Sequence, residues 1–363
     1  MQLKALERVM KRGSTRLIAG LMGQSARGER PDWRLRPYRV LFLRHDRIGD
    51  MILSTGILRA IAQSHPTIRL DVLASPGNAA VLRHEPYVND IVTFDKRAIT
   101  SYPSAFRDLR RRGYDAVIDC MVTAPSLTTL LLMLASGARF RIGVRQVGND
   151  FAYTLPVPPR ESAEHIVDKL GALVTAFGLQ PTAVDLRPRV HLTPQELERG
   201  EHAWGSGEVS GTTGPRLLVN ISAGRAHHHW PDERFVALIS RVRADMPDTQ
   251  IALVSSPGDR ARAAHIAIES GSRLIHDEGI RDAMAIVSRS QVVFTPDTSI
   301  SHACSARDIP AVVLHPMGNA SIWGPYETAG RAVESATDEV SGIPVEDALR
   351  PVLRMLGATR RND

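Results

Sequence analysis

The feature that most constrains the fold is a succession of buried strand, sharp turn and helix start within residues 292–306. The apolar run 292–294 predicts the strand, and Asp297, Thr298 and Ser299 belong to residue types that cap helices. A helix N-terminus has free N–H groups and a partial positive charge, so it suits an anion such as phosphate. His302 lies about one turn further on and can donate another hydrogen bond. For this segment alone, a capped helix with a partly buried histidine is the alternative interpretation.

A second segment of the same form, residues 40–61, occurs early in the chain. The run 40–43 predicts a buried strand, Gly49 permits a tight turn, and the apolar residues after Asp50 recur at helical spacing. We therefore expect Asp50 at a helix start just beyond the carboxyl end of a strand, where open α/β sheets bind ligands. Its carboxylate can cap the helix, or it can face a cleft and accept a proton from a hydroxyl.

Strands alternate with helical patterns along most of the chain, which predicts the α/β class with parallel sheets and right-handed crossovers. The predicted strands are 40–44, 70–74, 91–94, 116–120, 140–144, 217–221, 251–254, 292–295 and 311–314. The predicted helices include 163–177, 233–243, 260–270, 281–288 and 300–307. Pro181, Pro188 and Pro194 indicate a linker, and the Gly- and Ser-rich segment 205–214 indicates an exposed loop.

These patterns predict four parts of the chain. Residues 1–37 form a basic amphipathic extension, 38–185 and 186–340 form two Rossmann-like domains, and 341–363 form a C-terminal helix and tail. Each predicted domain carries one of the two strand-end motifs. Because ligand sites are common between domains, we expect Asp50 and the segment 297–302 on opposite walls of an interdomain cleft.

The composition fits a globular protein and argues against a nucleic-acid partner. The 363 residues are enough for two domains, with 43% hydrophobic and 23% charged residues. Only 5% are aromatic, and the net charge of +6 is concentrated in residues 1–39, with ten Lys or Arg against three Asp or Glu. Cys120 and Cys304 lie in apolar runs without C-x-x-C spacing, so we expect buried thiols in a reducing compartment.

The basic N-terminal extension has an amphipathic pattern. Apolar residues between positions 3 and 21 follow an approximate helical stripe with Lys and Arg between them. This is typical of a helix that binds the surface of an anionic membrane, and a solvated or domain-packed extension is the alternative. Arg16 interrupts any signal-peptide core, and Pro125 interrupts the longest uncharged stretch. We therefore expect a cytoplasmic protein with peripheral contact to a membrane.

Four segments occur in the order RIGDMIL at 47–53, HWPDERF at 229–235, DTSISHA at 297–303 and WGP at 323–325. Together they resemble glycosyltransferase family nine, the heptosyltransferases that build the inner core of bacterial lipopolysaccharide. The resemblance covers roughly residues 39–330. It implies GT-B architecture, with two Rossmann-like domains facing across a cleft, and inverting transfer of heptose from ADP-heptose to a lipid-linked acceptor at the inner face of the bacterial inner membrane.

The resemblance also implies roles for individual residues. Asp50 would be the general base that deprotonates the acceptor hydroxyl, with Arg47 and Gly49 beside it on the acceptor side. The sequence contains no Asp-x-Asp pair for a divalent metal, so we expect no metal cofactor and protein donors on the leaving diphosphate. The residues implied for donor and diphosphate binding are Ser222, Gly224, Arg225, His228, Asp297, Thr298, Ser299 and His302.

The chain departs from the family pattern at several of these positions. His228 stands where the family often has a lysine, and Arg225 is a second candidate for that role. Ser299 replaces a family glycine. The run of three histidines at 227–229 cannot easily converge on one metal ion. Two alternative functions stay open, namely a GT-B enzyme for another nucleotide sugar and a non-catalytic scaffold that binds a nucleotide sugar or glycan.

Overall fold

The computed structural model describes residues 28–122, 126–146, 149–205 and 214–359. It divides the chain into two compact units, Met1–Ala163 with Val167–Leu186 and Glu164–Ile166 with Arg187–Asp363. Most of the predicted amphipathic extension and of the predicted loop 205–214 lies outside the described residues. Within the described part, no helix is both long and apolar enough to cross a bilayer.

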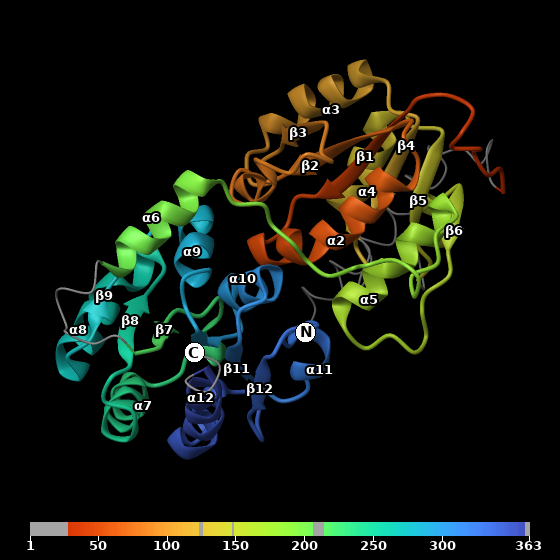
Figure 1. The fold of residues 1–363 in the computed structure, drawn as a ribbon. Coiled ribbons are helices and arrows are strands. Elements are labelled where there is room, and N and C mark those ends of the chain that lie inside the picture. Colours follow the sequence, from red (N-terminus) through yellow and green to blue (C-terminus); the bar gives the residue numbers. More distant parts are fainter. Residues whose placement is uncertain (1–27, 123–125, 147–148, 206–213, 360–363) are drawn as a thin grey trace, which may run out of the picture. The chain divides into compact units, whose positions relative to one another are not determined.

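The first unit is built on a six-stranded parallel sheet with the order β3-β2-β1-β4-β5-β6 (Figure 1). Its strands are β1 (Tyr38–Arg44), β2 (Ile68–Ala74), β3 (Asp90–Thr93), β4 (Ala116–Asp119), β5 (Phe140–Val144) and β6 (Leu155–Val157). Its helices are α2 (Ile48–Ser64), α3 (Ser101–Arg112), α4 (Leu127–Ser136) and α5 (Ile166–Gly171), with short 3-10 helices η1 (Ala79–Leu82), η2 (Asp150–Ala152) and η3 (Ala172–Phe177).

Alternate residues of β1 point to opposite faces of this sheet, as a strand requires. Leu41 and Leu43 pack with residues of α3 and α4 in one core cluster. Helix α2 packs against β1, β2 and η3. Because helices cover both faces, the central strands are buried throughout, which explains why the sequence shows continuous apolar runs there.

The second unit repeats the architecture with the order β12-β11-β10-β7-β8-β9, again with parallel pairing. Its strands are β7 (Arg216–Asn220), β8 (Gln250–Val254), β9 (Arg273–Leu274), β10 (Val292–Pro296), β11 (Ala311–His315) and β12 (Arg331–Glu334). Its helices are α6 (Pro194–Trp204), α7 (Asp232–Asp245), α8 (Arg260–Ser270), α9 (Ile280–Val287), α10 (Ser299–Arg307), α11 (Ala320–Trp323) and α12 (Val345–Thr359), with η5 (Ala226–His228), η6 (Pro257–Asp259) and η7 (Val340–Gly342).

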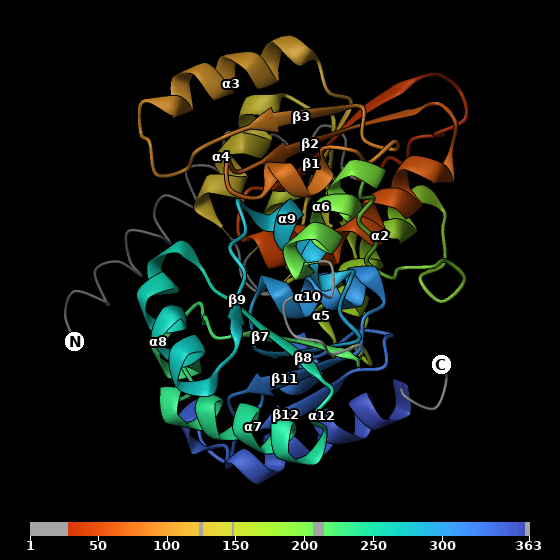
Figure 2. The same cartoon turned by 60° about the vertical axis from the view of Figure 1, so that its left-hand side comes forward.

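The second sheet also has a core on each face. Leu217, Val219 and Phe294 pack with α7, α8 and α12, which lie together on one side of the sheet in Figure 2. Leu218 and Val293 point the other way and pack with residues of α6, α9 and α10. The alternation of these neighbours along β7 and β10 follows the period of two expected for strands covered by helices on both faces.

Both sheets reverse their strand order at one point. In the first the reversal lies between β1 and β4, and in the second between β7 and β10. Open α/β sheets bind ligands in the crevice outside the carboxyl ends of the strands at such a reversal. The motifs that follow β1 and β10 therefore lie at the point of each sheet where a ligand is expected.

Several sequence predictions need correction. The helix predicted at 163–177 begins only at Ile166 and becomes the 3-10 helix η3 after Gly171. Pro194, predicted to lie in a linker, is the first residue of α6, where its missing N–H costs no hydrogen bond, and Thr193 with Glu196 forms a capping box. Strands β6, β9 and β12 were not predicted, because they are short and lie at or next to sheet edges. Cys120 and Cys304 are free and buried, as predicted.

Candidate active site

In the first unit the candidate site is the turn between β1 and α2. Helix α2 begins at Ile48, with Arg47 as the N-cap residue and Asp50 in the first turn, where a carboxylate interacts favourably with the helix dipole. The interpretation of Asp50 as the helix cap is therefore wrong. Gly49 was expected in a tight turn, but it is a buried helical residue and is not among the described glycines with positive φ. Asp50 itself is half-buried and Arg47 is exposed.

Arg44 and Asp46, which were not identified from the sequence, are charged groups near Asp50. The buried Arg44 donates from Nε to Ser54 Oγ (2.8 Å) and from Nη1 to Asp46 Oδ2 (3.0 Å). Ser54 Oγ in turn donates to the carbonyl oxygen of Asp50 at 2.7 Å. Asn78 Nδ2 donates to the Arg44 carbonyl oxygen (3.0 Å), which braces the turn. Hydrogen bonds through Ser54 thus connect Arg44, the last residue of β1, to the first turns of α2.

The pKa of Asp50 is raised, above all by burial. Asp46 also raises it, whereas Arg44 and Arg47 lower it. A carboxylate with a raised pKa is a stronger base than an ordinary Asp, and the two arginines favour its ionised form. The local charges therefore suit a group that has to accept a proton.

Asp119, at the end of β4, is a second perturbed carboxylate next to the same switch point. Burial raises its pKa to about 6, and it accepts hydrogen bonds from Met121 N and from the Tyr153 hydroxyl, each at 2.8 Å. Only 2% of its surface is exposed. Because so little of it reaches solvent, its chemistry is that of a structural anion close to Arg44 rather than of a group that meets substrate.

In the second unit the candidate site begins at the turn between β10 and α10. Thr298 is the N-cap residue, with its Oγ1 accepting from Ile300 N (3.2 Å), so it is the cap among the three predicted candidates. Ser301 N donates to the Thr298 carbonyl oxygen (3.1 Å). The amides of Ile300 and Ser301 therefore already donate to Thr298 within the turn. Of the four amides from Thr298 to Ser301, those of Thr298 and Ser299 have no hydrogen bond to the described residues.

Asp297 lies among histidines. Its Oδ2 is 3.8 Å from Nδ1 of His228 and 3.8 Å from Nδ1 of His315, and 14% of its side chain is exposed. His315, the last residue of β11, was missed by the sequence analysis and is completely buried. Burial lowers the pKa of His315 to about 4 and that of His302, on the first turns of α10, to about 3. Both rings are neutral near pH 7, so His302 can donate one hydrogen bond but adds no charge.

A buried asparagine joins this turn to the loop after β7. Asn220 Nδ2 donates to Thr298 Oγ1 (3.2 Å), and Asn220 Oδ1 accepts from Ser222 N (3.2 Å). Ser222 Oγ accepts from Ser256 N at 2.8 Å. Asn220 and His315 are each the polar last residue of a buried apolar strand. That position is the sequence signal that could have identified both residues.

The remaining predicted donor residues lie on the same loop. Gly224 and Arg225 are exposed, whereas His228 is buried, so the structure brings Ser222, His228, Asp297 and Thr298 close together but leaves Arg225 facing solvent. The His227 and His228 rings contact each other edge to face, with centroids 4.4 Å apart and an angle of 79° between the ring planes. Among the described residues, no three His, Cys, Asp or Glu side chains are arranged as a metal site.

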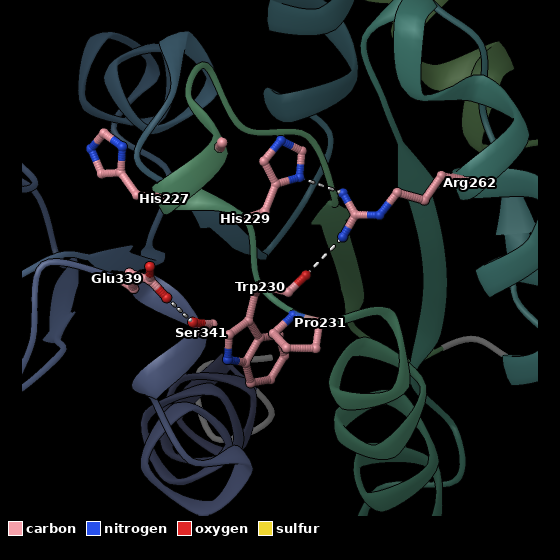
Figure 3. A pocket seen from close by; sticks show the side chains of 8 residues that line it. His227, His229, Trp230, Pro231, Arg262, Glu339 and Ser341 are labelled. Carbon is pink, nitrogen blue, oxygen red and sulfur yellow. Dashed lines mark hydrogen bonds between the residues drawn. The ribbon is translucent and has the colours of Figure 1, made fainter.

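A pocket of about 560 Å³ lies beside this loop (Figure 3). It is lined by Ala226, His227, His229, Trp230, Pro231, Arg262, Glu339 and Ser341. Asp297, Thr298 and His302 are not among its lining residues. Trp230 is fully buried and donates from Nε1 to the Ile343 carbonyl oxygen (3.0 Å), so this motif residue anchors the loop on the core.

Solved structures share the fold of this chain. The match to a glycosyl transferase family 9 protein from Veillonella parvula covers 90% of this chain and 99% of that protein, with a TM-score of 0.77 and 16% identity. The corresponding values for the ADP-heptose lipopolysaccharide heptosyltransferase II of Escherichia coli are 89%, 99%, 0.70 and 18%. The predicted α/β fold with two parallel sheets, of the GT-B class, is confirmed.

The sequence assigns the chain to a family within this class. Residues 103–347 match glycosyltransferase family 9 (heptosyltransferase), and lipopolysaccharide heptosyltransferase 2 of Escherichia coli is 21% identical over 82% of this chain and 88% of its own length. The chain belongs to glycosyltransferase family 9, as its four motifs predicted, and it is a glycosyltransferase.

Proposed function

We propose that this protein transfers heptose from ADP-heptose to a lipid-linked lipopolysaccharide core acceptor, with inversion at the anomeric carbon. The names of its relatives support heptose and the lipopolysaccharide acceptor, since they are lipopolysaccharide heptosyltransferases matched over more than four fifths of this chain. ADP-heptose is the donor named for the heptosyltransferase II structure of Escherichia coli. The observation that carries the proposal is Asp50, a half-buried carboxylate of raised pKa at the switch point of the first sheet.

In the proposed reaction Asp50 accepts the proton of the acceptor hydroxyl as its oxygen attacks the anomeric carbon. The bond between that carbon and the diphosphate oxygen breaks, and ADP leaves with the electron pair. Arg47 and Gly49, beside Asp50, belong to the acceptor side. Nothing else in the first unit needs to move a proton, because the leaving diphosphate is stable as an anion.

The second unit binds the donor in this proposal. The free amides of Thr298 and Ser299, at the N-terminus of α10, and the neutral His302 ring donate hydrogen bonds to the diphosphate. Arg225 and His228 add contacts from the loop after β7, together with Ser222 and Gly224, and Asp297 accepts hydrogen bonds from sugar hydroxyls. Protein donors rather than a divalent metal ion carry the charge of the leaving group.

The test is a transfer assay with the full chain, ADP-heptose and a core lipopolysaccharide acceptor that lacks heptose. We expect one heptose added to the acceptor, seen by mass spectrometry, and release of ADP. ADP should raise the melting temperature more than UDP or GDP, because a ligand that binds the native state stabilises it. Transfer with a different nucleotide sugar only, or stabilisation by ADP without any transfer, would contradict the proposal in favour of one of the two alternatives.

We also propose that the basic extension 1–37 attaches the protein to an anionic membrane beside its acceptor, on the cytoplasmic side. Its charge and amphipathic pattern support this, and most of it lies outside the described residues. Liposomes containing anionic lipid should sediment the full chain but not a chain that starts at Tyr38. Equal sedimentation of both would refute the attachment.

A further inference from the structure

One guanidinium on α8 holds the segment between β7 and α7. Arg262 donates from Nη1 to the Ile221 carbonyl oxygen (3.1 Å) and from the same nitrogen to His229 Nδ1 (3.0 Å). Nη2 donates to the Trp230 carbonyl oxygen at 2.7 Å, and Figure 3 shows the bonds to His229 and Trp230. Nε donates to the carboxylate of Asp232, the first residue of α7. The side chain thus contacts both ends of segment 221–232.

The residues between these contacts are those proposed to meet the diphosphate. Ser222, Gly224, Arg225 and His228 all lie within segment 221–232, after the anchor at Ile221 and before the anchors at its far end. Gly224 and Arg225 are exposed, and the backbone bonds near them are short-range, from His228 N to the Arg225 carbonyl oxygen and from His229 N to the Ala226 carbonyl oxygen. The path of the exposed part therefore depends on how its two ends are fixed.

The same contact determines which nitrogen of His229 carries the hydrogen. A guanidinium only donates hydrogen bonds, so His229 Nδ1 has to accept one and the hydrogen of the neutral ring is on Nε2. His229 is half-buried and lines the pocket in Figure 3. Its Nε2–H is thereby kept as a donor.

We propose that Arg262 is a positioning residue that holds segment 221–232 in its donor-binding conformation and fixes the Nε2–H tautomer of His229. A lysine cannot replace it, because the planar fork reaches four acceptors at once whereas an ammonium is a point charge on a flexible stem. The donor-binding part of this inference rests on the proposed function. The tautomer part does not.

The test compares Arg262→Lys with Arg241→Lys, a control on α7 whose exposed side chain pairs with Glu346. For Arg262→Lys we expect ADP to bind at least about tenfold more weakly, since a segment without its anchors has to be ordered when the ligand binds. The donor KM should rise similarly, while kcat changes by less than about threefold. Nitrogen-15 NMR of the ring should show loss of the single Nε2–H tautomer of His229. The control should match the wild type in all of these measurements.

Two outcomes overturn the inference, namely ADP affinity within about twofold of the wild type in Arg262→Lys, or an unchanged His229 tautomer. If Arg262→Lys does not fold, Asp232→Ala removes one acceptor only, and it should weaken ADP binding in the same direction by a smaller factor. Unchanged affinity in that variant also counts against the inference. If the wild type does not bind ADP, the proposed function fails, and the tautomer measurement still decides whether Arg262 positions His229.

Discussion

Substituting Arg281 should reveal how much one buried ion pair contributes to the stability of the second unit. Arg281, on α9, donates from Nε to Glu196 Oε1 (2.5 Å) and from Nη2 to Glu196 Oε2 (2.7 Å), and Nη2 also donates to the His191 carbonyl oxygen. The two side chains are only 5% and 6% exposed. Glu196 also completes the capping box of α6, so the pair joins the start of α9 to the start of α6.

The size of the effect follows from the pKa of Glu196. The hydrogen bonds from Arg281 above all, together with those from Thr193, lower that pKa from 4.5 to about 2, which corresponds to roughly 3 kcal/mol of stability for all of these contacts together. Removing one partner of a buried ion pair costs about 3–5 kcal/mol in other proteins, because the remaining charge is left without its partner. We therefore expect Arg281→Met to lower the free energy of unfolding by about 3 kcal/mol at pH 7, measured by urea denaturation.

The contribution of the Arg281–Glu196 pair to the free energy of unfolding should depend on pH. The folded-state pKa of Glu196 is depressed, so its stabilisation is complete above about pH 4.5 and is lost as the pH falls towards 2. The difference in the free energy of unfolding between the wild type and Arg281→Met should therefore become smaller as the pH falls over that range. Arg350→Met is the control, since Arg350 and Asp347 are 72% and 48% exposed, and it should change stability by less than about 0.5 kcal/mol. Two results would refute the reasoning. One is a change of less than about 0.5 kcal/mol in the free energy of unfolding of Arg281→Met, and the other is a difference from the wild type that stays the same at low pH.

Three further predictions concern the site and the core. Asp46→Asn should shift the acid limb of the kcat/KM profile to lower pH, because Asp46 raises the pKa of Asp50, and an unshifted limb contradicts this. Burial keeps His302 neutral, so its contribution to ADP binding should be one donated hydrogen bond to the diphosphate. By calorimetry, ADP binding should weaken about tenfold in His302→Phe and less in His302→Gln, which retains a donor. Equal losses of affinity in the two variants would contradict a hydrogen bond from His302. Gly200→Ala should destabilise the protein by about 1–3 kcal/mol in thermal unfolding, because the added Cβ would lie 2.4 Å from a carbonyl oxygen of α9. Gly357→Ala is the control, since its added Cβ would have no neighbour within 4 Å, and it should leave stability unchanged or raise it.

The sequence predicted the central strands and both strand-end motifs because these depend on local patterns. Buried parallel strands require continuous apolar runs, and the residue types that follow β1 and β10 are typical of helix starts. Strands β9 and β12 were missed because they are two and four residues long and partly exposed, so they leave no apolar run. Helix α6 was missed because Pro194 was interpreted as a linker signal, although proline also favours the first position of a helix.

The surroundings of the site could not be predicted in the same way, since they depend on contacts between distant residues. His315 meets Asp297 only because β11 pairs with β10, and Arg262 meets Ile221 only because α8 packs beside the loop after β7. Arg44 precedes the first motif, but its burial and its bonds to Ser54 follow from the packing of α2 on the sheet. Such pairs have no sequence spacing that one chain reveals.

The most direct test of the central claim is the turnover of Asp50→Asn with ADP-heptose and the heptose-deficient acceptor, measured beside its affinity for ADP. Asp108→Asn, an exposed carboxylate on α3, is the control. We expect Asp50→Asn to bind ADP as the wild type does and to lose about 100-fold or more in kcat, roughly the contribution of a positioned general base. Turnover equal to that of the wild type and of the control would contradict the account.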